Sequence, residues 1–291
     1  MDLDLAQLRA LDAAVTAGTL DGAARALHLT PSAISQRLKA LEAATGRVLL
    51  VRSKPVQVTG SGQPVLRLAR QIAMLTADAT RDLEVEDGGR PVTVPIAVNA
   101  DSMATWVLPA LAPLAAELAF DLHREDQEHT AALLRDGRVM AAVTAAAEPV
   151  PGCSVTRLGG MRYQPMASPA FLDRWFPDGI TAEALARAPV VVFDRRDDLQ
   201  HGYLRRRGVD PVAPPLHHVP ASADHVSAVA LGLGWGMVPR QQDRPAELVG
   251  LDADGAVDVV LYWQQWRLRS PSLDRVAAAV LAAARRELDQ A

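Results

Sequence analysis

The residues with the clearest chemical potential lie in one short run, Thr30–Lys39. Read as a helix, this run places Ile34, Leu38 and Leu41 on one face and small hydrogen-bonding side chains on the other. Hydroxyls and a carboxamide can read base edges in the DNA major groove, while a lysine one turn later can hold a phosphate. Taken alone, the run could also be an ordinary surface helix. The predicted DNA-contacting residues in it are Thr30, Pro31, Ser32, Ala33, Ser35, Gln36 and Lys39.

The capping signals around this run indicate three short helices. Thr30 can cap the third helix, and Pro31 fits its first position, where a missing N–H costs nothing. Asp4 and Gln7 have the spacing of a capping box at the start of the first helix. We expect Asp21 to cap the second. Small alanine side chains in the second helix would allow the close crossing of a helix-turn-helix.

A basic hairpin is expected directly after the third helix. The run 49–59 reads as two short strands with Arg52 and Lys54 near the tip. This is the position of a wing that contacts the DNA backbone or the adjacent minor groove. Residues 1–60 are therefore predicted to form a winged helix-turn-helix in which Arg52 and Lys54 also contact DNA.

A second set of polar side chains follows the expected strands of the region after Pro91. Val92–Val98 has the character of a buried strand, and strands then alternate with helices, which predicts βαβ units and a mainly parallel sheet. In such sheets ligands bind beyond the carboxyl ends of strands, near helix N-termini. Together with Asn99 at the end of the first strand, the candidates for binding a small ligand are Asn99, Asp101, Ser102, Thr105, Glu125, Asp126, Thr144, Phe193, Asp194, Ser222 and Asp224.

The chemistry of these candidates favours a small zwitterion that carries extra positive charge. Hydroxyls and N–H groups suit a carboxylate, whereas the acidic side chains suit ammonium or guanidinium groups through charge-assisted hydrogen bonds. For any single acid the alternative is a solvated strand end or a helix cap. The argument therefore depends on the cluster rather than on its members.

Between these two regions the sequence predicts a long helix over 62–87. Apolar residues recur there three and four positions apart, which is the spacing of a coiled-coil seam: Val65, Leu68, Ile72, Leu75 and Ala79. The helix could pack on its own domain, but a helix between two domains has little else to bury against. We therefore expect it to pair two subunits, which would set two DNA-binding heads on a dyad-symmetric operator. The charged run 84–90 is the predicted hinge.

Length and charge agree with this division. A chain of 291 residues predicts two or three compact units. These are a DNA-binding domain over 1–60, a dimerisation helix and hinge over 61–90, and a ligand-binding domain over 91–291. Its first lobe is expected at about 91–161 and 266–291, and its second at about 162–265. The net charge of −4 does not indicate DNA binding. However, six basic residues between 22 and 59 face a single acid, which favours it locally.

Several classes of protein are disfavoured by what the sequence lacks. It contains no apolar run of about 18 residues that could span a membrane and no basic, apolar leader. The single cysteine, Cys153, cannot form an internal disulfide, which is typical of the reducing cytoplasm. Neither the G-x-S-x-G turn nor a phosphate-binding G-x-x-x-x-G-K occurs, and His217-His218 would point to opposite sheet faces. We expect no catalytic site, no metal and no cofactor.

The N-terminal pattern resembles the winged helix-turn-helix of LysR-type transcriptional regulators. Two departures are Leu50, where the family often has an aromatic residue, and Gln36, where many members carry arginine. The matching residues are Ala23, Ala24, Leu27, Ser32, Ala33, Ile34, Ser35, Leu38, Leu41, Glu42, Gly46, Leu49, Arg52, Thr59 and Gly62. Beyond them, Asn99–Leu111, Glu125-Asp126, Phe193-Asp194 and Leu261–Trp263 are similar to the LysG/ArgP (IciA-type) branch of that family.

This resemblance implies an α/β protein with an α-rich winged helix-turn-helix and an effector domain of periplasmic-binding-protein type, built from two α/β lobes. It also implies a homotetramer that binds double-stranded DNA, senses lysine, arginine or histidine, and activates an exporter gene, with RNA polymerase as a further partner. The effector is expected to close or twist the lobes and so change the bend of the DNA. The alternatives are a regulator that answers another small effector, or none, and a solute-binding protein.

Overall fold

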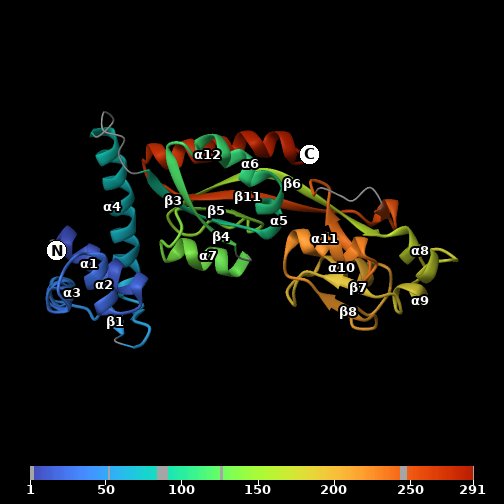
Figure 1. The fold of residues 1–291 in the computed structure, drawn as a ribbon, viewed down its shortest axis with the longest axis horizontal. Coiled ribbons are helices and arrows are strands. Elements are labelled where there is room, and N and C mark those ends of the chain that lie inside the picture. The colour runs from blue at the N-terminus through green and yellow to red at the C-terminus, as the bar shows by residue number, and fades with distance from the viewer. Residues whose placement is uncertain (1–2, 52, 84–90, 125–126, 243–247, 291) are drawn as a thin grey trace.

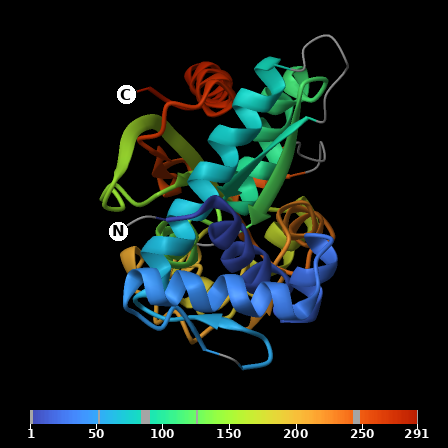
Figure 2. The same ribbon diagram turned by 90° about the vertical axis from the view of Figure 1, so that its left-hand side faces the viewer.

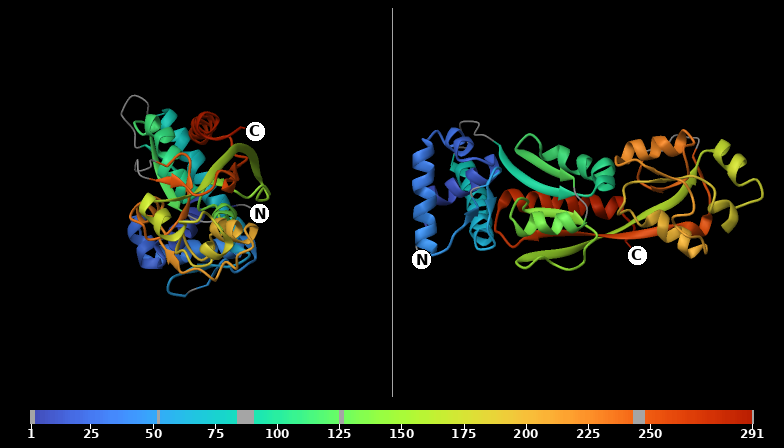
Figure 3. Two further views of the ribbon diagram at one scale, coloured as in Figure 1. Left: turned by 90° about the vertical axis from the view of Figure 1, so that its right-hand side faces the viewer. Right: turned by 90° about the horizontal axis from the view of Figure 1, so that it is seen from below.

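The computed structural model describes residues 3–51, 53–83, 91–124, 127–242 and 248–290. The molecule is elongated, with a small helical head at one end, a long helix beside it, and two α/β lobes in line beyond (Figures 1 and 3). The head has its own apolar core, while a larger core runs through the first lobe into the second. Among the described residues, none of the helices combines the length and apolar character that a membrane crossing requires.

The head is the predicted winged helix-turn-helix. Its elements are α1 (Leu5–Ala17), α2 (Leu20–Ala26), α3 (Pro31–Thr45), β1 (Leu50–Val51) and β2 (Gln57–Val58). Ile34 and Leu41 of α3 are fully buried against the alanines of α1 and α2, so the opposite face of α3 remains outside. The antiparallel pair of β1 and β2 forms the wing.

Two of the three predicted helix caps are confirmed and one is wrong. Asp4 accepts the backbone N–H of Gln7 at 3.0 Å, and Thr30 accepts that of Ala33 at 3.2 Å. The second helix is capped by Thr19, which accepts the N–H of Gly22 at 3.0 Å, and not by Asp21. Since the extended backbone ends at Thr19, Asp21 lies within the first turn, where its charge still favours the helix N-terminus.

The long helix α4 (Gly62–Leu83) crosses the molecule between the head and the first lobe (Figure 2). One side of it is buried within the chain, through Leu66, Ala69 and Met74. Of the predicted seam, Leu68 and Leu75 are each 37% exposed. The predicted continuation into the hinge 84–90 lies outside the described residues.

The first lobe is a sheet covered by helices on both faces. The parallel strands β5 (Ala141–Thr144), β3 (Val92–Val98) and β4 (Leu118–Arg124) lie side by side in that order. Helix α12 (Pro271–Glu287) covers one face, and α7 (Gln127–Arg135) lies on the other (Figure 1). The large buried side chains of this lobe include Trp263 and Trp266, which belong to its core.

Two long antiparallel strands connect the lobes. They are β6 (Cys153–Ala167) and β11 (Val257–Trp266), and β11 pairs with β5 at its first-lobe end. At the other end of β6, the strands β9 (Gly236–Pro239) and β10 (Val249–Gly250) pair with it in the antiparallel sense. The expectation of a mainly parallel sheet is therefore wrong: the sheet is mixed, because the connecting strands run in opposite directions.

The second lobe completes the architecture with a small parallel pair of strands and a shell of helices. The strands are β7 (Val190–Val192) and β8 (Leu216–His218). Its helices are α8 (Pro169–Trp175), α9 (Ala182–Leu185), α10 (Leu199–Arg206) and α11 (Ser222–Ala230). The two-lobed α/β class predicted from the sequence is thus confirmed.

After the first strand, the apolar sequence predicts a helix over about 105–118, and the structure differs from this prediction. Helical structure begins earlier, with α5 (Ala100–Ser102), then passes through a π-helical turn (Met103–Val107) and α6 (Leu108–Leu111) to a 3₁₀ turn (Ala112–Leu114). Pro109 is one physical reason, since it lacks the N–H that an α-helix would pair with the carbonyl of Thr105. Because the helical structure starts this early, α5 follows the carboxyl end of β3 almost directly.

Candidate DNA-binding and effector-binding sites

The outer face of α3 carries the side chains predicted to contact DNA. Ser32, Gln36 and Lys39 are exposed, as are Thr30 and Pro31 at its start. Ala33 and Ser35 are partly buried at the edge of this face. Within the described residues, this exposed face of α3 holds no large apolar side chain and is open to solvent.

The wing is fixed to α3 by one carboxylate. Oε1 of Glu42, on α3, accepts the backbone N–H of Leu49 at 2.9 Å, at the entrance to β1. At the exit, the hydroxyl of Thr59 donates to the carbonyl of Val48 at 2.7 Å. Lys54 is exposed in the loop between the strands. Arg52, the other predicted wing contact, lies outside the described residues. The wing therefore has a defined position relative to α3.

A cleft of about 970 Å³ opens between the two lobes. Six of the predicted effector-binding residues line it, three from each lobe: Asn99, Asp101, Thr144, Phe193, Asp194 and Ser222. They come from the carboxyl ends of β3, β5 and β7 and from the start of α11. The rule that ligands bind beyond the ends of parallel strands selected these positions.

Asp101 lies at the centre of the cleft's hydrogen bonding. Its Oδ2 accepts the phenol of Tyr163 at 2.7 Å, and its Oδ1 accepts the hydroxyl of Ser222 at 2.6 Å. Burial, the Asp101 charge and the hydrogen bond to it raise the pKa of Tyr163 well above its usual value, so the phenol stays a donor. Because each carboxylate oxygen can accept more than one hydrogen bond, Asp101 can also accept donors from a bound cation.

The acids of the second lobe shape the loop between β7 and α10. Oδ1 of Asp194 accepts the N–H groups of Arg196 and Asp197, at 2.7 and 3.1 Å. The carboxylate of Asp197 accepts the N–H groups of Phe193 and Leu199, at 3.0 and 3.1 Å. Both acids line the cleft, so they hold the loop and also contribute negative charge to it.

Three predicted residues are not brought to the cleft. Ser102 is fully buried, and Thr105 donates its hydroxyl to the carbonyl of Asp101 at 2.7 Å. Asp224 is exposed on the outer side of α11. Spacing explains Ser102 and Asp224, which lie one and two positions after the cleft-facing Asp101 and Ser222 and so turn away. Thr105 lies a full turn after Asp101, and its hydroxyl is directed to the helix backbone instead. The predicted Glu125 and Asp126 lie outside the described residues.

The cleft also contains residues that sequence reasoning did not select. They are Arg124, Tyr163, Arg196, Asp197, Arg206 and His225. Arg124 stands at the end of β4, where the same strand-end rule could have found it. His225 follows Ser222 by three positions, which places it on the same helix face. Tyr163 lies in the middle of a long strand, and no local signal in the sequence marks it.

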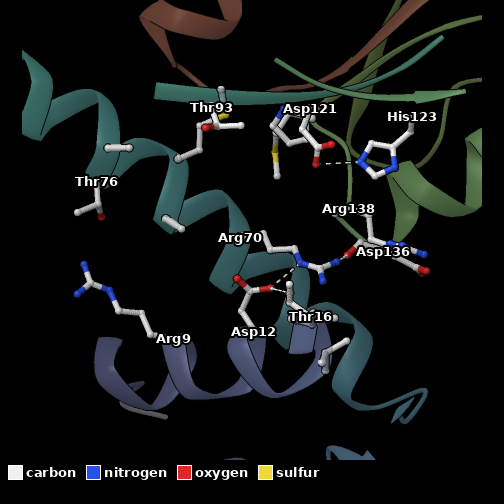
Figure 4. Close-up of a pocket in the computed structure, with 18 of the residues that line it drawn as sticks. Arg9, Asp12, Thr16, Arg70, Thr76, Thr93, Asp121, His123, Asp136 and Arg138 are labelled. Carbon is white, nitrogen blue, oxygen red and sulfur yellow. Dashed lines mark hydrogen bonds and ion pairs between the residues drawn. The ribbon is translucent and has the colours of Figure 1, made fainter. Parts of the chain in front are cut away.

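A second cavity, of about 1030 Å³, lies between the head and the first lobe. Figure 4 shows Arg70 of α4 at its centre, between Asp12 of α1 and Asp136 at the turn after α7. Nε of Arg70 donates to the Asp12 carboxylate at 2.8 Å, and its Nη1 donates to the carbonyl of Asp136 at 3.0 Å. This cavity lies where the head and the first lobe meet. The acidic side chains Asp101, Asp194 and Asp197 line the inter-lobe cleft instead. Within the described ranges, no three His, Cys, Asp or Glu side chains come together as metal ligands.

Comparisons with known proteins identify both domains. The chain matches the bacterial regulatory helix-turn-helix protein of the lysR family over residues 5–63 and the LysR substrate binding domain over residues 88–285. It is 42% identical over 275 residues to the lysine export transcriptional regulatory protein LysG of Corynebacterium efficiens, covering 92% of this chain and 93% of that protein.

Two solved structures share the whole architecture. The crystal structure of ArgP from Mycobacterium tuberculosis is 42% identical in sequence, with a TM-score of 0.88 over 100% of both chains. Full-length LysG from Corynebacterium glutamicum, with bound effector Arg, is 37% identical. Its TM-score is 0.79, over 98% of this chain and 99% of that chain.

Proposed function

Because this chain belongs to the LysR family of bacterial regulatory helix-turn-helix proteins, we propose that it controls transcription in answer to a basic amino acid bound between its lobes. It is a DNA-binding transcriptional regulator of the LysG/ArgP type. The proposal concerns the effector, the regulated gene, the assembly and the residues that make the contacts.

The observation that carries the effector proposal is the environment of Asp101. The side chains of Tyr163 and Ser222 fix this carboxylate at the mouth between the lobes, and Asp194 and Asp197 add negative charge opposite it. An ammonium or guanidinium group would complete this set through charge-assisted hydrogen bonds. The cleft arginines Arg124, Arg196 and Arg206 offer a counterpart for the α-carboxylate, as a basic zwitterion requires. The C. glutamicum LysG structure, which holds the effector Arg, supports this choice.

Since Asp101 belongs to the first lobe and Ser222 to the second, an effector that binds Asp101 acts where the lobes meet. It would favour one lobe arrangement in proportion to its differential affinity for the two. By analogy with the lysine export regulator from C. efficiens, the gene turned on would encode an exporter of the effector. RNA polymerase would then be a further partner, and the cytoplasm the place of action. Another small effector is the alternative.

Calorimetric titration of the full-length protein tests the effector. Lysine, arginine or histidine should bind, while leucine, which lacks the second cation, should not. Asp101→Asn removes the charge but keeps the shape, so we expect affinity to fall by roughly 10- to 100-fold, the value of a hydrogen bond to a charged group. Asp224→Asn is the matched control, since it removes an exposed acid of the second lobe. Absence of heat with all three basic amino acids would remove this effector class.

The DNA-binding proposal assigns specificity to α3 and affinity to the wing. Ser32, Ser35 and Gln36 would choose the operator sequence, while Lys39, Arg52 and Lys54 would hold phosphates. Gln36→Ala should lower the preference for the correct base by roughly 1–3 kcal/mol. Lys54→Ala should weaken all sequences about equally and reduce the salt dependence of binding by about one charge. Unchanged base preference in Gln36→Ala, measured by competition between operator variants, would show that the reading face is misassigned.

The assembly proposal rests on α4. Its apolar seam, with Leu68 and Leu75 more than a third exposed in the single chain, suits pairing with a second copy of the same helix. Two paired heads would read a dyad-symmetric operator, and effector domains could join two such dimers into a tetramer.

A further inference from the structure

His225 is a buried imidazole in the wall of the inter-lobe cleft. It lies one turn after Ser222 on α11 and is only 5% exposed. Both ring nitrogens are shielded from solvent, and neither makes a hydrogen bond of ordinary geometry, although the carbonyl of Met237 interacts with the ring. Leaving a polar group unpaired in the interior is costly. An apolar residue would fill the same space at lower cost, so packing alone does not explain a histidine here.

The charges around this ring are the same ones that form the proposed effector site. Asp101 of α5 and Asp197 of the loop after β7 act on His225 electrostatically. From β6, Tyr163 contributes a phenol that donates to Asp101. The other packed strands, β7 and β9, contain no titratable side chain. The cations that line the same cleft are Arg124, Arg196 and Arg206.

Burial is the largest influence on the ring and lowers the pKa of His225 below its usual value of 6.5. The two carboxylates and the Met237 carbonyl act in the opposite direction but do not outweigh it. The imidazole is therefore neutral at neutral pH and leaves Asp101 and Asp197 available to another positively charged partner.

We propose that His225 is a built-in competitor for the effector's positive group: protonated, it neutralises Asp101 and Asp197 and thereby weakens binding of a basic amino acid. This inference rests on the basic-amino-acid effector proposed above. Binding of a proton to His225 and of a cation to the cleft oppose each other, and by linkage each must weaken the other equally. Affinity for the effector should therefore fall as pH drops through the pKa of His225, by at most about tenfold per pH unit.

Calorimetry of the full-length protein with arginine, at about pH 7.5 and about pH 5.5, tests this proposal. Arginine has no group of its own that titrates in this range. Wild type should lose affinity on acidification and release protons on binding, seen as a dependence of the heat on the buffer. His225→Gln keeps a polar side chain that cannot be protonated, so its affinity should change by less than about twofold over the same range.

His218→Gln is the matched control, because His218 is an exposed histidine of the same lobe and should leave the wild-type pH dependence unchanged. His225→Asn provides a second neutral variant if the first does not fold, as judged by its thermal transition. A wild type that binds arginine equally at both values, or a His225→Gln variant with the wild-type slope, would overturn the role of His225 and leave the effector proposal intact. A wild type that binds no basic amino acid at either value would overturn both.

Discussion

Cys153 illustrates how burial decides the reactivity of a single side chain. It is the only cysteine in the chain and is 2% exposed. Burial raises the pKa of its thiol to about 12, although Arg67 and Arg267 act to lower it. Since the thiolate is the reactive form, the native protein should not react with a thiol reagent at about pH 8, and one thiol should appear on unfolding in denaturant. Rapid reaction of the folded protein would contradict this, with the Cys153→Ser variant as the blank.

The residues of the candidate effector site were predictable only where they follow a backbone rule. Asn99, Asp101, Thr144 and Ser222 stand at strand ends or a helix start, so the sequence alone selected them. Tyr163 could not be found in this way, because its role depends on a strand that passes between the lobes and meets Asp101 only in three dimensions. The assignment of Asp224 failed for a similar reason. A carboxylate suits the site, but this side chain lies on the exposed face of α11.

At the scale of elements, the contact between α4 and α12 fixes the long helix to the first lobe. Asp78 of α4 is 3% exposed, and its two oxygens accept the hydroxyls of Ser270 and Ser272, both at 2.5 Å. Ser270 is also the N-cap of α12, where it accepts the N–H of Leu273 at 3.2 Å. The carboxylate thus lies at the positive end of a helix.

We predict that Asp78→Ala destabilises the protein by about 2 kcal/mol or more, because it leaves buried hydroxyls without an acceptor. The free energy of unfolding from urea titration checks this. Asp82→Ala, on the exposed side of the same helix, is the control and should change stability by less than about 0.5 kcal/mol. Equal stability of the Asp78 and Asp82 variants would mean that the α4–α12 contact contributes nothing to stability.

Element types were more predictable from the sequence than element boundaries. The caps at Asp4 and Thr30 are local hydrogen bonds, and the alternation of strands and helices reflects burial, so both could be read directly. The mixed order of the large sheet could not, since strand direction depends on where the chain returns. Local irregularity was also missed: the π-helical turn at Met103–Val107 depends on packing as well as on Pro109.

At the scale of the whole molecule, Arg70 couples the head to the first lobe. It holds Asp12 of α1 with one nitrogen and the carbonyl of Asp136 with another (Figure 4). One turn earlier, the Arg67 guanidinium stacks over Trp266 with 4.9 Å to the ring centre. Gly137 allows this approach, since its φ is +64° and a Cβ there would lie 3.0 Å from the Cα of Arg67. The lobe therefore contacts both the linker helix and, through Arg70, the head.

We predict that Arg70→Ala uncouples effector from DNA. Effector affinity should stay within about twofold of wild type, while the factor by which arginine changes operator affinity should shrink toward one from a typical 5- to 150-fold. Operator titrations with and without arginine measure this factor. Arg9→Ala, which removes an exposed arginine lining the same cavity, should retain the wild-type factor. Full coupling in Arg70→Ala would exclude this contact from signal transmission.

The two connecting strands have a consequence for how the family can diversify. The chain enters the second lobe along β6 and leaves it along β11, and these strands are neighbours, with Tyr163 paired to Val257. The second lobe is thus an insertion whose ends lie side by side. Such a lobe can be exchanged as one cassette, so the second-lobe half of the candidate effector site could be replaced while the DNA-binding head and the helix α4 remain the same.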